Sequence, residues 1–178
     1  KNLGKGFAVR EGMMAAKGSR RLYMDADNSV SVVEFNKMLP YLPTGASSID
    51  HAYDVVVGSR LVEGAHVSLK QPLLQRLANF KIRAVIKMLG LGVVRDSQCG
   101  FKCFTAEAAE KVFPKVTTNG RMSDLEALVI AKKMGYKIKE VPVFYAYTPG
   151  SRSRRHEYFS SLWDAIRIFF RVRRVTAS

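Results

Sequence analysis

Arg21-Leu22-Tyr23-Met24-Asp25-Ala26-Asp27 is an apolar run that leads directly into two carboxylates. Residues 21–24 predict a buried strand. Open α/β sheets bind ligands beyond the carboxyl ends of their strands, so we expect Asp25 and Asp27 beside a ligand. Mg²⁺ and Mn²⁺ need only one or two protein carboxylates where phosphates supply the other oxygens. The run therefore predicts a metal site, although a turn whose Asp side chains bond the backbone explains the same spacing.

Further apolar segments alternate with helical patterns along the rest of the chain. Strands are expected at residues 54–58, 101–104 and 137–145. Helices are expected around residues 8–13, from 31 to before Pro40, over 71–89, after Thr105, and from 123 to about 135. Strands that alternate with helices predict an α/β domain with a mostly parallel sheet flanked by helices.

Two of the expected helix starts carry the pattern of a capping box. Ser31 is followed by Glu34, and Ser123 by Glu126. Each serine and its glutamate are expected to satisfy the other's free backbone N–H group. On this interpretation Glu126 is only a capping partner. Asp124 lies in the first turn of its helix, where the helix dipole favours a carboxylate.

The composition is strongly basic, with 29 Lys and Arg against 15 Asp and Glu and a formal net charge of +14. Such a field attracts anions, whether nucleic acid, phosphorylated substrates or acidic lipids. A basic nucleic-acid-binding module stays open as an alternative, but no recognition helix or aromatic sheet motif supports it. Cys99 and Cys103 lack the further ligands of a zinc site and are expected to be ordinary thiols. No apolar run approaches the ~20 residues of a membrane span.

Gly4-Lys5-Gly6 forms a second candidate for ligand binding. It could bring backbone N–H groups and one ammonium close to a phosphate or a sugar. A glycine turn before the first helix explains the same residues. The segment is not a Walker loop, because the glycine spacing and the Lys-Ser/Thr ending of that motif are absent.

Four motifs, taken in their order along the chain, carry a family resemblance. They are Asn2-x-Gly4-Lys5-Gly6-x-Ala8-Val9-Arg10-x-Gly12, Asp25-Ala26-Asp27, Gly58-Ser59-Arg60, and Arg95-Asp96-Ser97-Gln98-Cys99-Gly100-Phe101-Lys102-x-Phe104. Together they resemble the family 2 glycosyltransferases, and within them most closely the dolichyl-phosphate β-glucosyltransferases. The family's first strand, with a Pro-Ala-Tyr-Asn-Glu-like motif, and its N-terminal membrane anchor have no counterpart here. We therefore expect the chain to correspond to the part that follows them.

The resemblance implies a GT-A fold, N-terminally incomplete, and a metal-dependent, inverting transfer of glucose from UDP-glucose to dolichyl phosphate. It also implies a Mg²⁺ or Mn²⁺ cofactor and a location at the endoplasmic reticulum membrane, with the active site facing the cytosol and no nucleic-acid partner. Departing UDP gains negative charge, which a fixed cation stabilises without proton transfer. A related transferase for mannose or another sugar, or for another polyprenyl phosphate, stays open.

The resemblance also assigns roles to single residues. The donor is expected at Gly4, Lys5, Gly6, Asp25 and Arg60, the metal at Asp25 and Asp27, and the lipid phosphate at Arg76, Gln98 and Lys102. Arg60 and Arg76 are expected to help catalysis as arginine forks around the phosphates, although a surface ion pair explains either of them. Asp124 occupies the place of an acidic general base in many relatives. Because the acceptor is already an oxyanion, a helix-start role for Asp124 stays the alternative.

The C-terminal segment has the pattern of a basic amphipathic helix. One face carries Phe159, Leu162, Trp163, Ile166 and Phe170, and another carries Arg167, Arg171 and Arg174. This pattern is typical of a helix that lies in a bilayer interface. Residues 152–178 are therefore predicted to contact the membrane, and residues 1–151 to form the catalytic domain. A terminal helix packed on the core, with solvated arginines, is the alternative.

Overall fold

The computed structural model describes residues 2–42, 52–68, 73–146 and 155–173. In chain order the elements are α1 (Lys5–Ala15), β1 (Arg20–Met24), the 3-10 turns η1 (Val32–Lys37) and η2 (Leu39–Tyr41), β2 (Val55–Ser59), β3 (His66–Val67), α2 (Leu73–Met88), β4 (Phe101–Thr105), α3 (Ala106–Val112), η3 (Phe113–Lys115), α4 (Ser123–Lys133), β5 (Ile138–Pro142), β6 (Phe144–Tyr145) and α5 (Arg155–Val172). The expected strand over 137–145 is divided into β5 and β6. The side chains of Arg76 and Phe159, and all of Arg174, lie outside the described residues.

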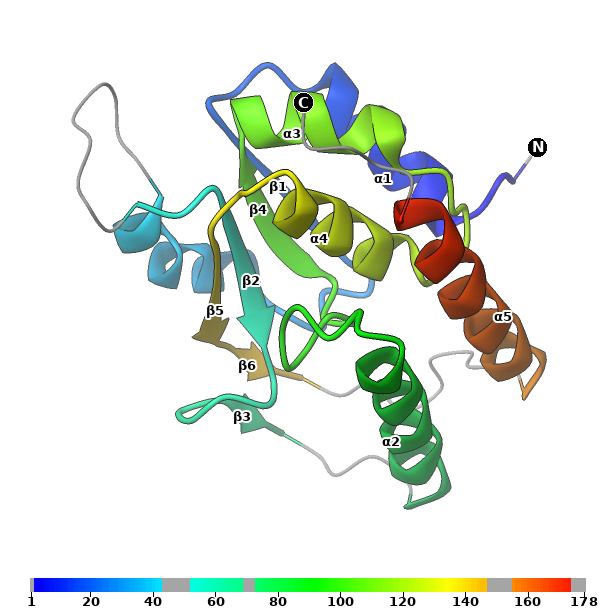
Figure 1. Ribbon diagram of the computed structural model, residues 1–178. Coiled ribbons are helices and arrows are strands. Elements are labelled where there is room, and N and C mark those ends of the chain that lie inside the picture. Colours follow the sequence, from blue (N-terminus) through cyan, green and yellow to red (C-terminus); the bar gives the residue numbers. More distant parts are fainter. Residues whose placement is uncertain (1, 43–51, 69–72, 147–154, 174–178) are drawn as a thin grey trace.

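Four strands form the central sheet, in the order β1-β4-β2-β5. β2 runs parallel to β5, whereas β4 runs antiparallel to β1 and to β2. The sheet is therefore mixed, and the expectation of a mostly parallel sheet is corrected at β4. After α2 the chain returns to the edge where β2 ends, so β4 starts there (Figure 1). The residues before β4 consequently lie at the same edge as the residues after β1 and β2.

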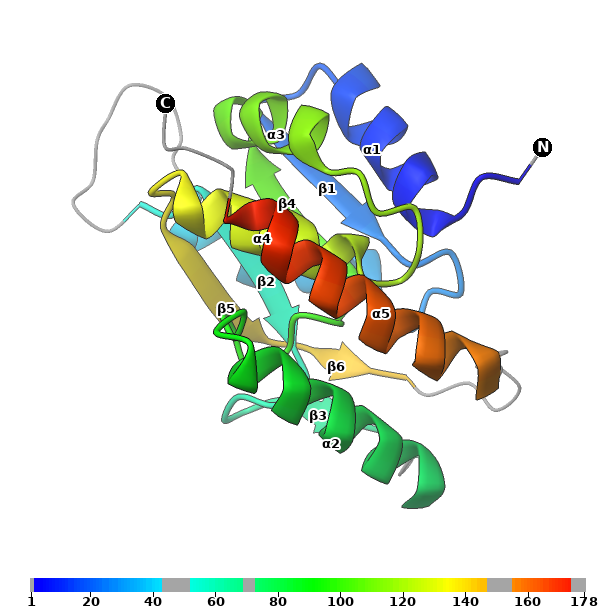
Figure 2. The ribbon, with the colours of Figure 1, turned by 45° about the vertical axis from the view of Figure 1, so that its right-hand side comes forward.

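The two faces of the sheet are covered by different layers. Helices α1, α3, α4 and α5 lie over one face, and the η1–η2 segment lies over the other (Figures 1 and 2). Val55 and Val57 pack into the core on the helix side, and Val56 packs into the core on the opposite side. All three side chains are fully buried. Burying one such side chain stabilises the fold by about 1.5–3 kcal/mol, so β2 anchors both cores.

Helix α5 packs against α2 and α4 with one side and exposes aromatic side chains on another. Ala165, Ile168 and Val172 are buried in the helix-side core. Trp163 and Phe170 are 56% and 62% exposed. The helix therefore packs on the core, and contact of its exposed face with a membrane stays a prediction. Within the described ranges no helix is long and apolar enough to span a bilayer.

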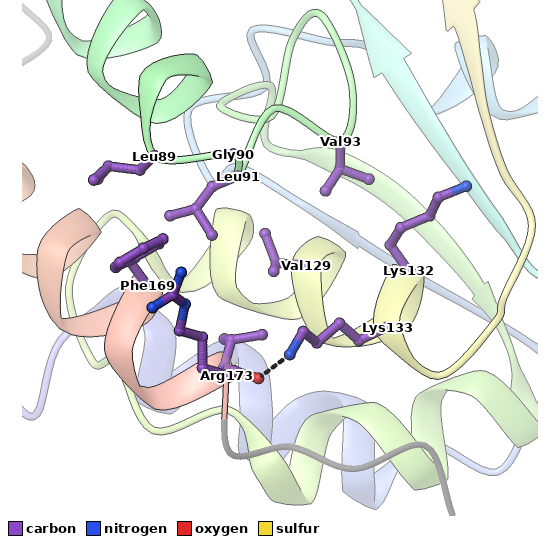
Figure 3. A pocket seen from close by; sticks show the side chains of 10 residues that line it. Leu89, Gly90, Leu91, Val93, Val129, Lys132, Lys133, Phe169 and Arg173 are labelled. Atoms are coloured by element: carbon purple, nitrogen blue, oxygen red, sulfur yellow. Dashed lines mark hydrogen bonds between the residues drawn. The ribbon is translucent and has the colours of Figure 1, made fainter.

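A small apolar hollow of about 240 Å³ lies where α5 meets α4 and the end of α2 (Figure 3). Its apolar lining comes from Leu89, Leu91, Val93, Val129, Phe169 and Val172. Beside it, the Lys133 ammonium donates to the main-chain carbonyl of Val172 at 2.6 Å. This bond satisfies a carbonyl that the end of a helix leaves free. It holds the last turn of α5 against α4.

The predicted capping box at Ser31 is half correct. The Ser31 hydroxyl accepts a hydrogen bond from the Val33 amide at 3.4 Å, as an N-cap does. The Glu34 carboxylate does not reach back to Ser31. It accepts from the Phe144 amide at 2.9 Å and from the Lys37 ammonium at 2.7 Å. Phe144 lies 110 residues away from Glu34 in sequence, so the local pattern could not show this contact.

Candidate active site

The carboxyl edge of the sheet gathers three segments that are far apart in sequence. Asp25 follows β1, Arg60 follows β2, and residues 96–100 precede β4. The Asp25 amide donates to the Gly100 carbonyl at 2.8 Å. A Cβ atom at position 100 would lie well under 3.0 Å from the Asp25 carboxylate, so only glycine leaves room for that carboxylate. The predicted strand-end position of Asp25 is confirmed.

Lys5, at the start of α1, bridges two carboxylates. Its ammonium lies 2.7 Å from Asp25 Oδ1 and 2.9 Å from Asp124 Oδ2. Burial lowers the pKa of the Lys5 ammonium, but Asp124 and Asp25 more than offset this and hold the pKa above its usual value. Lys5 and Asp25 are each about one third exposed, at 34% and 37%, whereas Asp124 is 3% exposed. The cluster is therefore open to solvent at Lys5 and Asp25 and closed at Asp124.

Asp124, the buried member of this cluster, lies in the first turn of α4. Its Oδ1 atom accepts from the Tyr23 hydroxyl at 2.8 Å and lies 3.9 Å from the Lys102 ammonium. Tyr23 and Lys102 are partners in the β1–β4 register, which places them side by side under α4. Burial raises the pKa of Asp124, but Lys102, Lys5 and Tyr23 together hold that pKa below its usual range. Asp124 is therefore ionised at neutral pH, with both oxygens engaged inside the protein.

Lys102 is fully buried rather than open to a lipid phosphate. Its ammonium donates to the Cys99 carbonyl and lies 5.5 Å from the centre of the Tyr23 ring. Burial lowers its pKa from the usual range. In this structure the Lys102 ammonium lies near Asp124 inside the protein, and its contact with the acceptor stays a prediction. Gln98 is half-buried, and its amide donates to the Met122 sulfur at 3.2 Å.

Arg60 forms a two-point pair with Asp96. Its Nε and Nη2 groups donate to the two Asp96 oxygens at 2.7 and 2.8 Å, and its backbone amide adds a bond of 3.0 Å. Asp96 is 2% exposed; burial raises its pKa, but Arg60 holds the pKa below its usual range. Glu140 in turn accepts from the Asp96 amide at 3.0 Å. The Nε and Nη2 groups of Arg60 thus bind this carboxylate, and a contact of Arg60 with a phosphate stays a prediction.

Asp27 is exposed, and its side chain bonds the backbone in a turn, which is the alternative to a metal site that the sequence left open. Its Oδ1 atom accepts from the Ser29 amide at 3.0 Å, and Asn28 between them has a φ of 53°. Across the described residues no three His, Cys, Asp or Glu side chains group closely enough to hold a metal ion. Two carboxylates fit Mg²⁺ or Mn²⁺ where phosphate oxygens and water complete the shell. The metal role of Asp25 and Asp27 stays a prediction.

Gly4 and Gly6 seat the start of α1 on the loop at residues 117–119. The Gly6 amide donates to the Asn119 carbonyl at 2.8 Å, and the Gly4 amide donates to the Asn2 side chain at 2.9 Å. A Cβ atom at either glycine would lie under 3.0 Å from a carbonyl oxygen of this loop. The two N–H groups expected to face a phosphate are therefore engaged within the protein. Lys5 alone of this motif presents its functional group to the cluster.

The predicted capping box at Ser123 is wrong. Helix α4 starts at Ser123 itself, and the buried Ser123 hydroxyl has no hydrogen-bond partner. Glu126 is fully buried and accepts from the Thr117 and Thr118 amides at 3.0 and 2.7 Å. The carboxylate therefore binds the backbone amides of this loop instead of the amides at the start of its own helix.

The sequence did not indicate the hydrogen bond of Tyr23 to Asp124 or the pairing of Asp96 with Arg60. Tyr23 carries a polar group in a strand whose neighbours are apolar, which is the signal that could have marked it. Buried phenol groups usually have a hydrogen-bond partner. No local pattern in the sequence pairs Asp96 with Arg60, because the two residues lie 36 positions apart. Arg76 lies within α2, but its side chain is not among those described.

Three curated proteins show what the chain is similar to. It is 30% identical over 173 residues to a dolichyl-phosphate beta-glucosyltransferase of Trichomonas vaginalis, which covers 96% of this chain and 52% of that protein. A second dolichyl-phosphate beta-glucosyltransferase of this organism is 35% identical over 144 residues. The matched segment covers 80% of this chain and 42% of that protein. The human dolichyl-phosphate beta-glucosyltransferase is 31% identical over 160 residues. The matched segment covers 85% of this chain and 47% of that protein. The chain spans about half the length of these relatives. No protein-family model matches it.

Proposed function

The chain is a relative of the dolichyl-phosphate β-glucosyltransferases among the family 2 glycosyltransferases, and on that premise we propose that it transfers glucose from UDP-glucose to dolichyl phosphate. The observation that carries this proposal is similarity at 30–35% identity over 80–96% of the chain. We propose further that the mixed sheet belongs to a GT-A fold and that the transfer inverts the anomeric carbon.

The Lys5–Asp25–Asp124 cluster supports a reaction whose leaving group is a nucleoside diphosphate. Charge develops on the departing UDP, and a cation fixed in advance stabilises it without reorganisation. Lys5 is such a cation, because two carboxylates hold its ammonium at the edge where α/β sheets bind ligands. Asp25 lies beside it and would face the donor.

Asp124 would act through its charge rather than as a base. Its carboxylate is ionised, buried and bonded to Tyr23 and Lys5. The acceptor phosphate is already an oxyanion, so the reaction does not require a proton acceptor. Asp124 then keeps Lys5 charged and fixes its position.

A Mg²⁺ or Mn²⁺ ion would be held by Asp25 and Asp27 together with the donor phosphates. When bound, it would supply further charge stabilisation to the leaving diphosphate. Both carboxylates follow the end of β1, and Asp27 is exposed. We propose Gln98 and Arg76 for the acceptor side; Arg60 would support this edge through Asp96.

The acceptor is a lipid, and α5 offers a surface suited to a membrane. Trp163 and Phe170 are exposed, and the Arg167 guanidinium lies 5.5 Å from the Trp163 ring. Apolar and basic side chains on one helix suit the interface of an anionic bilayer. We therefore propose that residues 152–178 contact the cytosolic face of the endoplasmic reticulum membrane and that residues 1–151 form the catalytic part.

The proposal is tested by incubating membranes that contain the protein with dolichyl phosphate and either radiolabelled UDP-glucose or GDP-mannose. We expect label in the lipid fraction from UDP-glucose alone, and less of it in the presence of a chelator. Label from GDP-mannose alone would assign a different donor, and no label from either would remove the proposed activity. Duplex and single-stranded DNA, titrated at two salt concentrations, test the nucleic-acid alternative.

A further inference from the structure

Glu126 carries a set of contacts that helix capping does not explain. Its carboxylate is fully buried, and it accepts from the Thr117 amide, the Thr118 amide and the Thr117 hydroxyl at 3.0, 2.7 and 3.2 Å. Arg171 of α5 adds a fourth donor at 2.9 Å. A buried carboxylate is costly unless it is paired and hydrogen-bonded. Here these donors compensate that cost, and two of them are adjacent amides of one loop.

The loop that Glu126 binds has no regular secondary structure of its own. Residues 116–119 are neither helix nor strand, so their backbone groups need partners from elsewhere. Glu126 supplies the acceptor for two of the amides. The carbonyl groups of the same loop point toward α1, where the Asn119 carbonyl accepts from the Gly6 amide at 2.8 Å. The loop is therefore held by α4 on one side and holds α1 on the other.

The contact between the loop and α1 is too close to allow a side chain. A Cβ atom at Gly6 would lie under 3.0 Å from the Thr118 carbonyl, and one at Gly4 equally close to the Asn119 carbonyl. Lys5 lies between these two glycines, and its ammonium reaches Asp25 and Asp124 at 2.7 and 2.9 Å. The position of Lys5 thus depends on the position of the loop.

We propose that Glu126 is a positioning residue of the active site: it fixes residues 117–119, and through them the start of α1, so that Lys5 reaches Asp25 and Asp124. Glu126 itself touches none of these three residues. The importance of Lys5 for catalysis rests on the proposed function, whereas the chain of contacts from Glu126 to Lys5 does not.

The contacts are tested by Glu126→Gln, which keeps the shape of the side chain and removes its charge. The rate at which an acylating reagent labels Lys5 is measured by mass spectrometry, with the exposed Lys17 as internal reference. We expect Lys5 to be labelled severalfold faster in the variant, because its ammonium is freed from the two carboxylates. The matched control is Glu107→Gln, which removes an exposed carboxylate paired with Lys111 and should leave Lys5 unchanged. An unchanged labelling rate in folded Glu126→Gln would overturn the proposal.

The effect of Glu126 on catalysis is tested by the kinetics of glucose transfer. Glu126→Gln should lower kcat/KM for UDP-glucose by about tenfold or more, since small displacements of a positioned group are costly, while Glu107→Gln keeps it. A residue that only stabilises the fold would lower the unfolding temperature and leave both Lys5 labelling and kcat/KM unchanged at temperatures where the variant is folded. If the unaltered protein transfers no glucose, the proposed function fails, and the labelling result still decides the contacts.

Hydrogen exchange on the unaltered protein provides a measurement that does not depend on the variant folding. The Thr117, Thr118 and Gly6 amides should be protected and should open together, as one cooperative unit. Free exchange at Thr117 and Thr118 beside a protected Gly6 would show that Glu126 does not hold the loop, and would refute the proposal.

Discussion

Replacing Gly6 with alanine would place a methyl group 2.6 Å from the Ser123 Cβ atom and closer still to the Thr118 carbonyl oxygen. Both neighbours are firmly held: Ser123 begins a buried helix and the Thr118 amide is bound by Glu126. The start of α1 must therefore move. Overpacking of this kind costs about 1–3 kcal/mol, and the Gly6–Asn119 hydrogen bond adds about 0.5–1.5 kcal/mol if it breaks. Better helix propensity returns up to about 1 kcal/mol.

The matched control lies on the same helix. A Cβ atom at Gly12 meets nothing within 4 Å, so Gly12→Ala should gain about 0.5–1 kcal/mol from propensity alone. Gly6→Ala should lower the free energy of unfolding by about 1–3 kcal/mol, which for a chain of this size shifts the unfolding temperature by roughly 2–12 °C. Thermal and urea unfolding followed by circular dichroism measure both variants. Equal stabilisation by the two substitutions would refute the close packing of α1 on the loop.

Three further predictions concern other parts of the molecule. Asp96→Asn leaves the Arg60 guanidinium without its buried anion and should lower the free energy of unfolding in urea by about 3 kcal/mol; a loss below about 0.5 kcal/mol would show that the pair is unimportant. Because the pKa of Asp124 is lower in the folded chain than in the unfolded one, the unfolded state binds more protons near pH 4. Stability from this group should be present above about pH 4 and decline as the pH falls further, and Asp124→Asn should flatten that decline; an identical pH profile in urea titrations contradicts the assignment. Trp163→Ala should weaken binding to anionic vesicles in a sedimentation assay, whereas Val33→Ala, at an exposed apolar residue on the other face of the sheet, should not; equal binding by both variants would remove α5 from the membrane contact.

The elements of the fold could be predicted because their signals are local. The run before Asp25 and the β-branched run at residues 54–58 each specify a buried strand without reference to the rest of the chain. The direction of β4 could not be predicted, since alternation of helices and strands does not say to which edge a connection returns. The mixed sheet, with β4 reversed, is what brings residues 96–100 beside Asp25.

The sequence indicated where several charged residues lie in the fold, but not which of them pair. Asp25 and Lys5 meet as expected for one ligand-binding edge. Arg60, however, binds Asp96 across 36 residues, and Lys102 turns inward toward Asp124. The sequence around a charged residue does not show whether that residue binds a ligand or a distant side chain. Burial decides between these outcomes, and burial depends on long-range packing.

We propose that the charged cluster of Lys5, Asp25 and Asp124 serves glucosyl transfer. The most direct test of this proposal is the rate of glucose transfer from UDP-glucose to dolichyl phosphate by Asp124→Asn, compared with the unaltered protein and Glu107→Gln in the same membranes. Loss of the carboxylate that holds Lys5 should reduce the rate by about 10²-fold, the cost of misplacing a positioned group, while the control keeps its activity. An undiminished rate in folded Asp124→Asn would show that the cluster does not serve the transfer.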